Sequence, residues 1–417
     1  MNNLYPESIY FMALQRALGF ASKTLKPALA KFGTAQRIFQ ASERELEQSG
    51  IFTKAQLEKL NSRSVETALE TYSFCKNSGV TVLCVSDSSY PKRLRSIPDP
   101  PCVLYVLGDL PDTDSEPSVS IVGSRKPSEY SALSSFNLSR SLASAGFVIV
   151  SGGAVGIDST AHEGALDVGG KTVAVLGTGL FSDYLMKQEP LRRRICQSGA
   201  LVTEFPPKMP VQKFSFPMRN RIIAALGLGT VVVQAARTSG SLITASFAAE
   251  QGRDIFVLPG HAGESSFEGS NELIKNGAKP VFSFSDISEE YCNLFVGKID
   301  LSAGKLCTAK SRLTAGPAFH KPLAVSEKAV SERQKEVAPP SPSINKKFTG
   351  CSIQRGLSED AQLVYNSFRK NISLFDELSG FCGLESRRLL SALTELEING
   401  LVTRLSGNRF EKQSDII

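Results

Sequence analysis

Short apolar runs alternate with helical stretches between residues 70 and 297. Most runs are continuously apolar, which is typical of strands buried on both faces of a sheet. The runs cover residues 81–85, 103–107, 119–122, 147–150, 172–176, 200–203, 230–234 and 255–258. The helical stretches cover residues 130–145, 157–168, 189–198, 218–226 and 240–251. This repetition predicts an α/β domain with a Rossmann-like, doubly wound, mostly parallel sheet, on which ligands bind beyond the carboxyl ends of the strands.

Smaller units are predicted on both sides of this domain. Residues 1–68 have apolar positions at helical spacing and turns at glycines, which predicts a small helical domain of the SAM or helix-hairpin-helix type. A helical cap on the sheet domain is the alternative. Residues 357–417 read as helices followed by a hairpin with its turn at 406–408, a winged helix. Since this segment holds seven Lys/Arg and nine Asp/Glu, binding to a protein is at least as expected as binding to duplex DNA.

The net positive charge of the chain is concentrated in one segment. The chain holds 47 basic and 41 acidic residues, a net charge of +6, but residues 298–356 alone hold eleven basic and four acidic residues. The rest of the chain therefore sums to −1 (36 basic and 37 acidic residues). With its Pro and Ser residues, 298–356 reads as a basic flexible linker. A nucleic-acid partner would need a local cluster of donors on the folded domains.

Composition excludes several classes of protein. Hydrophobic residues make up 41% and charged residues 21%, as in globular proteins. No apolar run approaches the ~20 residues of a membrane span, and the N-terminus lacks the pattern of a signal peptide. We therefore expect a soluble, cytoplasmic protein with no membrane contact. The eight cysteines and three histidines are scattered, so reduced thiols and no metal site are expected.

Small residues stand at the ends of four predicted strands or open the helices that follow. Glycines let backbone N–H groups approach an anion, and helix N-termini add unpaired N–H groups and a positive dipole. One such loop could be a simple turn, and no dinucleotide or P-loop motif is complete. Four loops on one sheet edge favour a row of phosphate pockets. Their residues are Gly123, Ser124, Arg125, Ser151, Gly152, Gly153, Ala154, Gly156, Gly177, Thr178, Gly179, Ser239, Gly240 and Ser241.

A basic segment adds to these loops. Two arginines and an amide open a helix directly after aromatic residues. Arginine pairs with phosphate in a bidentate manner, and an exposed aromatic ring can stack on an unpaired base. The predicted contacts are Lys213, Phe216, Arg219, Asn220 and Arg221. The alternatives are core packing for one of Phe214 and Phe216, and an ion pair with Glu204 or another carboxylate for the arginines.

Catalytic groups are not evident. Asp158 and His162 lie four residues apart at a helix start, but a capping Asp and a hydrogen-bonded core His are favoured over an acid–base pair. Ser239 and Ser241 lack an evident base, and no acidic cluster suggests a metal-assisted nuclease. No catalytic residue, metal or cofactor is predicted.

The motifs taken together resemble the DprA/Smf family of DNA-processing proteins of natural transformation. They are Val122-Gly-Ser-Arg125, Ser151-Gly-Gly-Ala-Val-Gly-Ile-Asp-Ser-Thr-Ala-His162, Val175-Leu-Gly-Thr-Gly-Leu180, Glu204-Phe-Pro206, Phe216-Pro-Met-Arg-Asn-Arg-Ile-Ile223, Ser239-Gly-Ser-Leu-Ile-Thr-Ala245, Gln251-Gly-Arg253, Pro259-Gly260 and Asn271-Glu-Leu-Ile-Lys-Asn-Gly-Ala278. The resemblance implies a non-enzymatic protein that binds and protects single-stranded DNA, forms a homodimer through the Rossmann-like domain and loads the RecA recombinase. By position it implies the same loop and basic residues as the DNA site.

Four positions depart from the family pattern. Gln234 stands where Glu is frequent, Val155 where Arg is frequent, and Leu185 where Pro is usual. Thr238 stands where Lys or Arg is frequent, and the neighbouring Arg237 could compensate. Two other functions stay open: a nucleotide phosphoribohydrolase, whose glycine-rich loop is missing after Pro259-Gly260, and a scaffold with a vestigial pocket.

Overall fold

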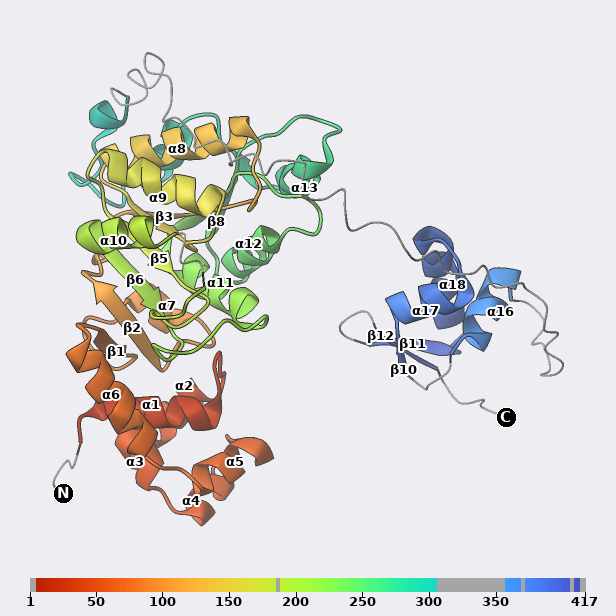
Figure 1. Ribbon diagram of the computed structural model, residues 1–417, viewed down its shortest axis with the longest axis horizontal. Coiled ribbons are helices and arrows are strands. Elements are labelled where there is room, and N and C mark those ends of the chain that lie inside the picture. The colour runs from red at the N-terminus through yellow and green to blue at the C-terminus, as the bar shows by residue number, and fades with distance from the viewer. Residues whose placement is uncertain (1–4, 185–187, 306–356, 369–371, 406–408, 413–417) are drawn as a thin grey trace, which may run out of the picture. The chain divides into compact units, whose positions relative to one another are not determined.

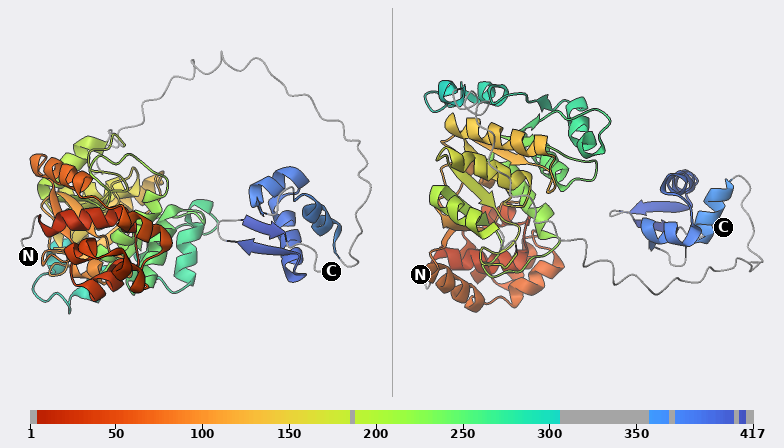
Figure 2. Two further views of the ribbon diagram at one scale, coloured as in Figure 1. Left: turned by 90° about the horizontal axis from the view of Figure 1, so that it is seen from below. Right: turned by 45° about the horizontal axis from the view of Figure 1, so that its top comes forward.

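The protein is described by a computed structural model that covers residues 5–184, 188–305, 357–368, 372–405 and 409–412. The chain divides into two compact units, Met1–His320 and Lys321–Ile417. Figure 1 labels the elements of both units, and Figure 2 shows them from two further directions. None of the described helices is long and apolar enough to cross a membrane.

A nine-stranded sheet forms the centre of the first unit, in the order β1-β2-β6-β5-β4-β3-β7-β8-β9. The strands are β1 (Thr81–Cys84), β2 (Val103–Gly108), β3 (Ser118–Val122), β4 (Val148–Ser151), β5 (Thr172–Val175), β6 (Gly199–Thr203), β7 (Gly229–Val232), β8 (Asp254–Val257) and β9 (Lys279–Pro280). The mostly parallel α/β fold is confirmed, and each predicted strand is present. The antiparallel part of the sheet lies at one edge, where β1 pairs antiparallel with β2 and β2 pairs antiparallel with β6. The two-residue β9 was missed because it is too short to show a pattern.

The order of the strands reverses between β3 and β7. From β3 the chain builds outward through β4, β5 and β6, then returns to β7 on the other side of β3 and continues to β8 and β9. The two central strands are parallel and in register from Val119 beside Gly229 to Val122 beside Val232. Their carboxyl ends therefore lie side by side at a topological switch point, where doubly wound sheets bind their ligands.

Helices cover both faces of the sheet. Apolar residues of α8 (Glu129–Ser144), α9 (Ile157–Asp167) and α14 (Ser285–Tyr291) form one core cluster with inward residues of β3, β4, β7 and β8. Apolar residues of α7 (Lys92–Ser96), α11 (Ser215–Leu226) and α12 (Gly240–Glu250) belong to the cluster on the other face. α10 (Glu189–Ser198) packs against α9 and the strands β2, β5 and β6, and α13 (Glu268–Lys275) packs against β8.

The N-terminal helices share the core of the sheet. They are α1 (Glu7–Leu18), α2 (Leu25–Phe32), α3 (Ala35–Gln40), α4 (Glu43–Gln48), α5 (Lys54–Asn61) and α6 (Glu66–Asn77), and Figure 1 shows them together at one end of the unit. The buried residues of α1 belong to one cluster with those of β2, and Gln15 donates a hydrogen bond of 3.1 Å to the Glu204 carbonyl. The helical region therefore runs to Asn77 rather than to 68, and it caps the sheet.

The first residues of the predicted linker belong to the sheet domain. Ile299 and Leu301 pack against the apolar cluster of the α8 face, and the Asp300 N–H donates to the Ala145 carbonyl at 3.0 Å. The folded region therefore continues past 298. The rest of the predicted linker, 306–356, lies outside the described residues.

The second unit is the predicted winged helix. It contains α16 (Glu359–Asn366), β10 (Ile372–Leu374), α17 (Phe375–Cys382), α18 (Ser386–Ile398), β11 (Val402–Leu405) and β12 (Arg409–Lys412), with the strands in the antiparallel order β10-β12-β11. Val364, Leu378, Leu389 and Phe410 are among the residues of its core. The predicted turn at 406–408 lies outside the described residues.

A cavity at the switch point

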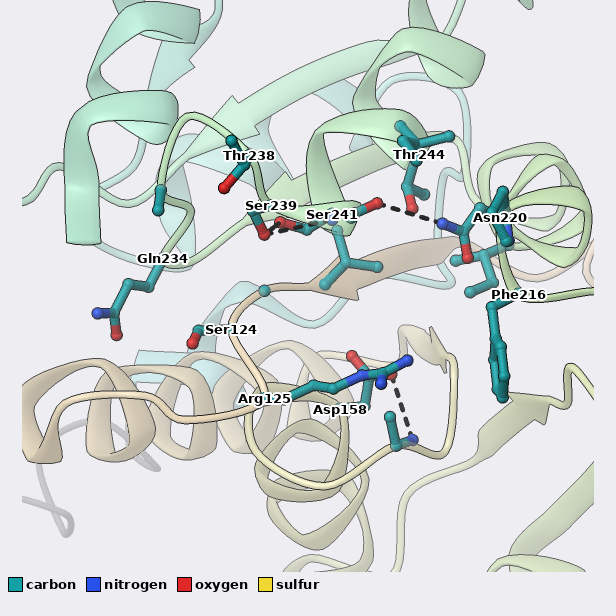
Figure 3. Close-up of a pocket in the computed structure, with 18 of the residues that line it drawn as sticks. Ser124, Arg125, Asp158, Phe216, Asn220, Gln234, Thr238, Ser239, Ser241 and Thr244 are labelled. Atoms are coloured by element: carbon teal, nitrogen blue, oxygen red, sulfur yellow. Dashed lines mark hydrogen bonds between the residues drawn. The ribbon is translucent and has the colours of Figure 1, made fainter. Parts of the chain in front are cut away.

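A cavity of about 700 Å³ opens where the loops after β3 and β7 leave the sheet. Figure 3 shows its walls: the loop with Ser124 and Arg125, the start of α12 and one side of α11. We call it the switch-point cavity. The predicted site residues that line it are Gly123, Ser124, Arg125, Ala154, Lys213, Phe216, Arg219, Asn220, Ser239, Gly240 and Ser241.

Glycines press the loop after β3 against the start of α9. A Cβ atom on Gly123 would lie 2.7 Å from the Ile157 side chain, and one on Gly156 would lie 2.4 Å from the Ser124 carbonyl oxygen. Gly156 also has a φ of +90°, which side-chain-bearing residues rarely adopt. The Ile157 N–H donates to the Ser124 carbonyl at 3.1 Å. This packing fixes the backbone from which the Arg125 side chain extends.

Arg125 is exposed and its guanidinium lies over an aromatic ring. Its Cζ is 5.4 Å from the centroid of Phe216, and the two side chains come from opposite walls of the cavity (Figure 3). In the described part of the chain no carboxylate forms an ion pair with Arg125. Stacking orients the guanidinium, and its N–H groups donate no hydrogen bond to the described residues, so they can bind an anion.

The two phenylalanines of the basic segment differ in exposure. Phe216 is half-buried and packs against Gly177, where a Cβ would lie 2.8 Å from its ring, and its centroid is 5.3 Å from that of Tyr184. Phe214 is 50% exposed. Phe216 therefore packs on the protein with one side and borders the cavity with the other.

Arg219 lines the cavity but is tied to the protein. Its Nη1 donates to the Gly152 carbonyl at 2.5 Å and to the Val175 carbonyl, which connects α11 to the ends of β4 and β5. Burial lowers the pKa of Arg219 to about 10, although nearby Asp158 favours its charged form. Arg219 remains cationic at neutral pH, but these backbone bonds make it a positioning residue as well as a source of positive charge.

Asp158 is the one acidic residue among those lining the cavity. Its Oδ2 accepts a hydrogen bond of 3.3 Å from the Ala154 N–H, and burial raises its pKa. The basic lining residues are Arg125, Lys126, Lys213 and Arg219, so the lining carries four positive charges minus one, or +3 with Asp158 ionised. The cavity favours anions.

The start of α12 adds backbone donors. Ser239 is the N-cap of this eleven-residue helix, and its Oγ accepts from the Ser241 N–H at 3.4 Å. Asn220 donates its side-chain amide to the Gly240 carbonyl at 3.3 Å, which fixes α11 beside this helix start. The first turn of a helix has N–H groups without intrahelical partners and a positive dipole, and here it borders the cavity.

The four predicted loops do not all border the cavity. The other predicted residues do not line the cavity: Ser151, Gly152, Gly153, Gly156, Gly177, Thr178, Gly179 and Arg221. The Ser151 hydroxyl donates to the Ile121 carbonyl at 2.6 Å, and the Gly179 N–H donates to the Met209 carbonyl at 3.0 Å. These polar groups serve the fold because Arg219 and the segment 206–209 cover the ends of β4 and β5.

Arg221 forms an ion pair, which was the alternative to its predicted contact with DNA. Its Nη2 lies 2.5 Å from Glu204 Oε2 and its Nε lies 3.5 Å from Asp99 Oδ2, with 1% of the side chain exposed. Burial raises the pKa of Glu204 to about 6, against the effect of Arg221. Arg221 thus joins α11 to the end of β6 instead of reaching the cavity.

Other lining residues were missed from the sequence. Lys126 is exposed and directly follows Arg125, so its charge was a usable signal. Ser266 lies in a short 3-10 helix, Ser265–Phe267, that is distant in sequence and has no motif. Among the departing residues, Gln234 accepts from the Ser128 N–H at 2.9 Å, where α8 starts. Arg237 pairs with Glu268 at 3.2 Å and does not line the cavity, so compensation for Thr238 is not supported.

Asp158 and His162 do not form an acid–base pair in the cavity. His162 is buried, its Nδ1 is 2.7 Å from Thr172 Oγ1, and burial lowers its pKa to about 3. It does not line the cavity. The described residues contain no group of three or more His, Cys, Asp or Glu that could hold a metal ion.

The fold and the site define an α/β protein with a Rossmann-like sheet, an electropositive cavity at its switch point and a winged helix after it in sequence. Residues 81–292 match the family described as DNA recombination-mediator protein A, and residues 353–408 match the DprA winged helix domain. The chain therefore belongs to the DprA/Smf family.

Two relatives and one solved structure illustrate this membership. The chain is 39% identical over 215 residues to DNA processing protein DprA of Bacillus subtilis, which covers 52% of this chain and 72% of the relative. It is 43% identical over 201 residues to Protein Smf of Escherichia coli, covering 48% and 54%. The X-ray structure of DprA from Streptococcus pneumoniae is similar with a TM-score of 0.59 and 33% identity, covering 68% of this chain and 97% of that chain.

Proposed function

We propose that this chain binds single-stranded DNA in the switch-point cavity without reading its sequence. The observation that carries the proposal is Arg125, exposed and without a carboxylate partner among the described residues, stacked on the half-buried ring of Phe216. The guanidinium that lies over this ring offers donors to a phosphate, and the part of the ring that borders the cavity offers an aromatic contact to a neighbouring base. The start of α12 supplies further phosphate donors.

The same features favour a single strand over a duplex. Bases in a duplex are paired and stacked on one another, so the Phe216 ring has no base face to receive. The donors are a guanidinium, ammonium groups and backbone N–H groups, which contact phosphates and carry no sequence information. We therefore expect similar affinity for different single-stranded sequences.

We propose a wider role in DNA processing that goes beyond binding. We infer that the protein protects incoming DNA and loads the RecA recombinase during transformation, and that it forms a homodimer through the sheet domain. The description of the matching family as a recombination mediator supports this role. We also infer that it acts without catalysis, which is supported by the one carboxylate of the lining, Asp158, being buried and bonded to backbone.

The first test compares single-stranded and duplex oligonucleotides of one length by fluorescence anisotropy. We expect tighter binding of the single strand. Its affinity should fall with salt with a logarithmic slope of about −0.7 for each phosphate contacted. Equal affinity for both forms, or an affinity independent of salt, contradicts the proposal.

Removing the second unit should leave this binding in place. A chain ending at His320 retains all of the cavity, because the lining residues run from Val122 to Ser266 in the first unit. We expect an affinity for single-stranded DNA within about twofold of the full chain at high salt, where linker charges are screened. A large loss at high salt would instead assign the binding to the winged helix.

A further inference from the structure

A patch made of an exposed phenylalanine, a half-buried phenylalanine and an exposed lysine lies outside the cavity. Phe181, 43% exposed, follows the end of β5, and its ring is perpendicular to that of Phe74 on α6 at a centroid distance of 5.4 Å. Lys208 Nζ lies 4.3 Å from the Phe74 centroid. Lys208 is exposed, and no carboxylate in the described ranges forms an ion pair with it. We call Phe74, Phe181 and Lys208 the outer patch.

Backbone hydrogen bonds fix the loops that carry the patch. The Phe181 N–H donates to the Pro207 carbonyl at 2.9 Å, and the Gly179 N–H donates to the Met209 carbonyl at 3.0 Å. The loop after β5 and the segment after β6 therefore hold each other at the carboxyl edge of the sheet. Exposed aromatic rings on a fixed support can receive a base at little conformational cost.

The outer patch is connected to the switch-point cavity along this edge. Tyr184, three residues after Phe181, contacts Phe216 with the ring centroids 5.3 Å apart. The Arg125 guanidinium lies over the same Phe216 ring. On the other loop, the segment that begins near Lys208 continues to Lys213, which lines the cavity. Half-buried or exposed rings, and cations that form no ion pair among the described residues, thus continue from the cavity toward α6.

The residue types of the outer patch indicate which class of ligand it binds. Binding of an apolar protein surface would gain nothing from the charge of Lys208. Binding of a free phosphate would gain nothing from two aromatic rings. Aromatic rings together with cations match the bases and phosphates of an unpaired strand. The charge of Lys208 is complementary to a phosphate, and the ring contacts of Tyr184 connect the patch to the proposed binding surface.

We propose that a single strand held in the switch-point cavity continues over the outer patch, where a base stacks on Phe181 and a phosphate contacts Lys208. This inference rests on the proposed function, and it adds a second subsite with its own length dependence. A strand too short to leave the cavity does not reach the patch.

The test measures binding of two oligothymidines, one of about 6 and one of about 20 nucleotides, a range set by known single-strand site sizes. Phe181→Ala should weaken the binding of the long strand at least about fivefold, the lower end for one stacked base, and leave the short strand unchanged. Lys208→Ala should reduce the salt slope of the long strand alone by about 0.7. Lys171→Ala is the control, because Lys171 is an exposed lysine directly before β5, at the opposite edge of the sheet, where its ion pair with Glu116 contributes little to stability.

The outcomes separate this inference from the proposed function. If both patch variants bind the long strand like the wild type while Arg125→Ala weakens both strands, the outer patch is not a subsite and the proposed function stands. If the patch variants weaken short and long strands equally, they act on the cavity, and the subsite is again rejected. If the wild type binds neither strand, the proposed function itself fails.

Discussion

Replacing Arg125 by alanine should weaken the binding of single-stranded DNA about 10- to 100-fold, the range for losing a hydrogen-bonded charge contact. The reason is its placement: the guanidinium is exposed, stacked on Phe216 and free of carboxylate partners in the described structure. The salt slope for a single strand should also drop by about 0.7 because one phosphate contact is lost. Fluorescence anisotropy against salt measures both quantities.

A matched variant separates this contact from net charge. Arg44 is an exposed arginine on α4, which Figure 1 shows among the N-terminal helices at one end of the unit. Arg44→Ala removes the same charge and should change the affinity by less than about twofold. If both variants weaken binding to the same degree, the cavity is not the site. Since Arg125 is exposed, the stability of Arg125→Ala should stay within about 0.5 kcal/mol of the wild type.

Replacing Arg221 by alanine should lower the free energy of unfolding by about 3–5 kcal/mol at neutral pH. The change leaves the carboxylate of Glu204 fully buried, with its 2.5 Å ion-pair partner removed. Arg193→Ala is the control, since that arginine forms an exposed ion pair with Glu189 and such pairs contribute only about 0–1 kcal/mol. Urea unfolding of the three proteins measures the difference, and equal losses in the two variants contradict the prediction.

The pH dependence of this variant has a defined sign. Burial raises the pKa of Glu204 to about 6 in the folded protein, above its ordinary value of 4.5. A carboxyl whose pKa is raised by folding stabilises the fold when protonated, and this contribution is lost as the pH rises through the folded pKa. Without Arg221 the folded pKa rises further. The stability deficit of Arg221→Ala should therefore be smaller at about pH 5 than at about pH 8.

The sequence allowed prediction of what depends on local pattern. Continuous apolar runs located the strands that carry the cavity, and glycines after them located its loops, because both features need only neighbouring residues. The exposure of each loop could not be predicted. Gly177–Gly179 and Ser239–Ser241 look alike as sequence, but the first is covered by the segment 206–209 and the second borders the cavity.

Two arginines on one helix show the same limit of prediction from sequence. Arg219 and Arg221 stand two residues apart on α11 and carry the same charge. Arg219 donates hydrogen bonds to backbone carbonyls at the cavity wall. Arg221 instead forms ion pairs with Glu204 and Asp99 and does not line the cavity. Their roles depend on partners that arrive from β4, β5 and β6, which are distant in sequence. Lys126 was missed for a different reason, since no motif beyond its position next to Arg125 singled it out.

The last strand of the sheet has a consequence for the behaviour of the protein at high concentration. β9 consists of Lys279 and Pro280, and it pairs on one side with β8. The proline nitrogen carries no hydrogen and the lysine is charged, so another chain gains few hydrogen bonds by adding a strand here. We therefore expect this edge of the sheet to disfavour edge-to-edge pairing with another chain.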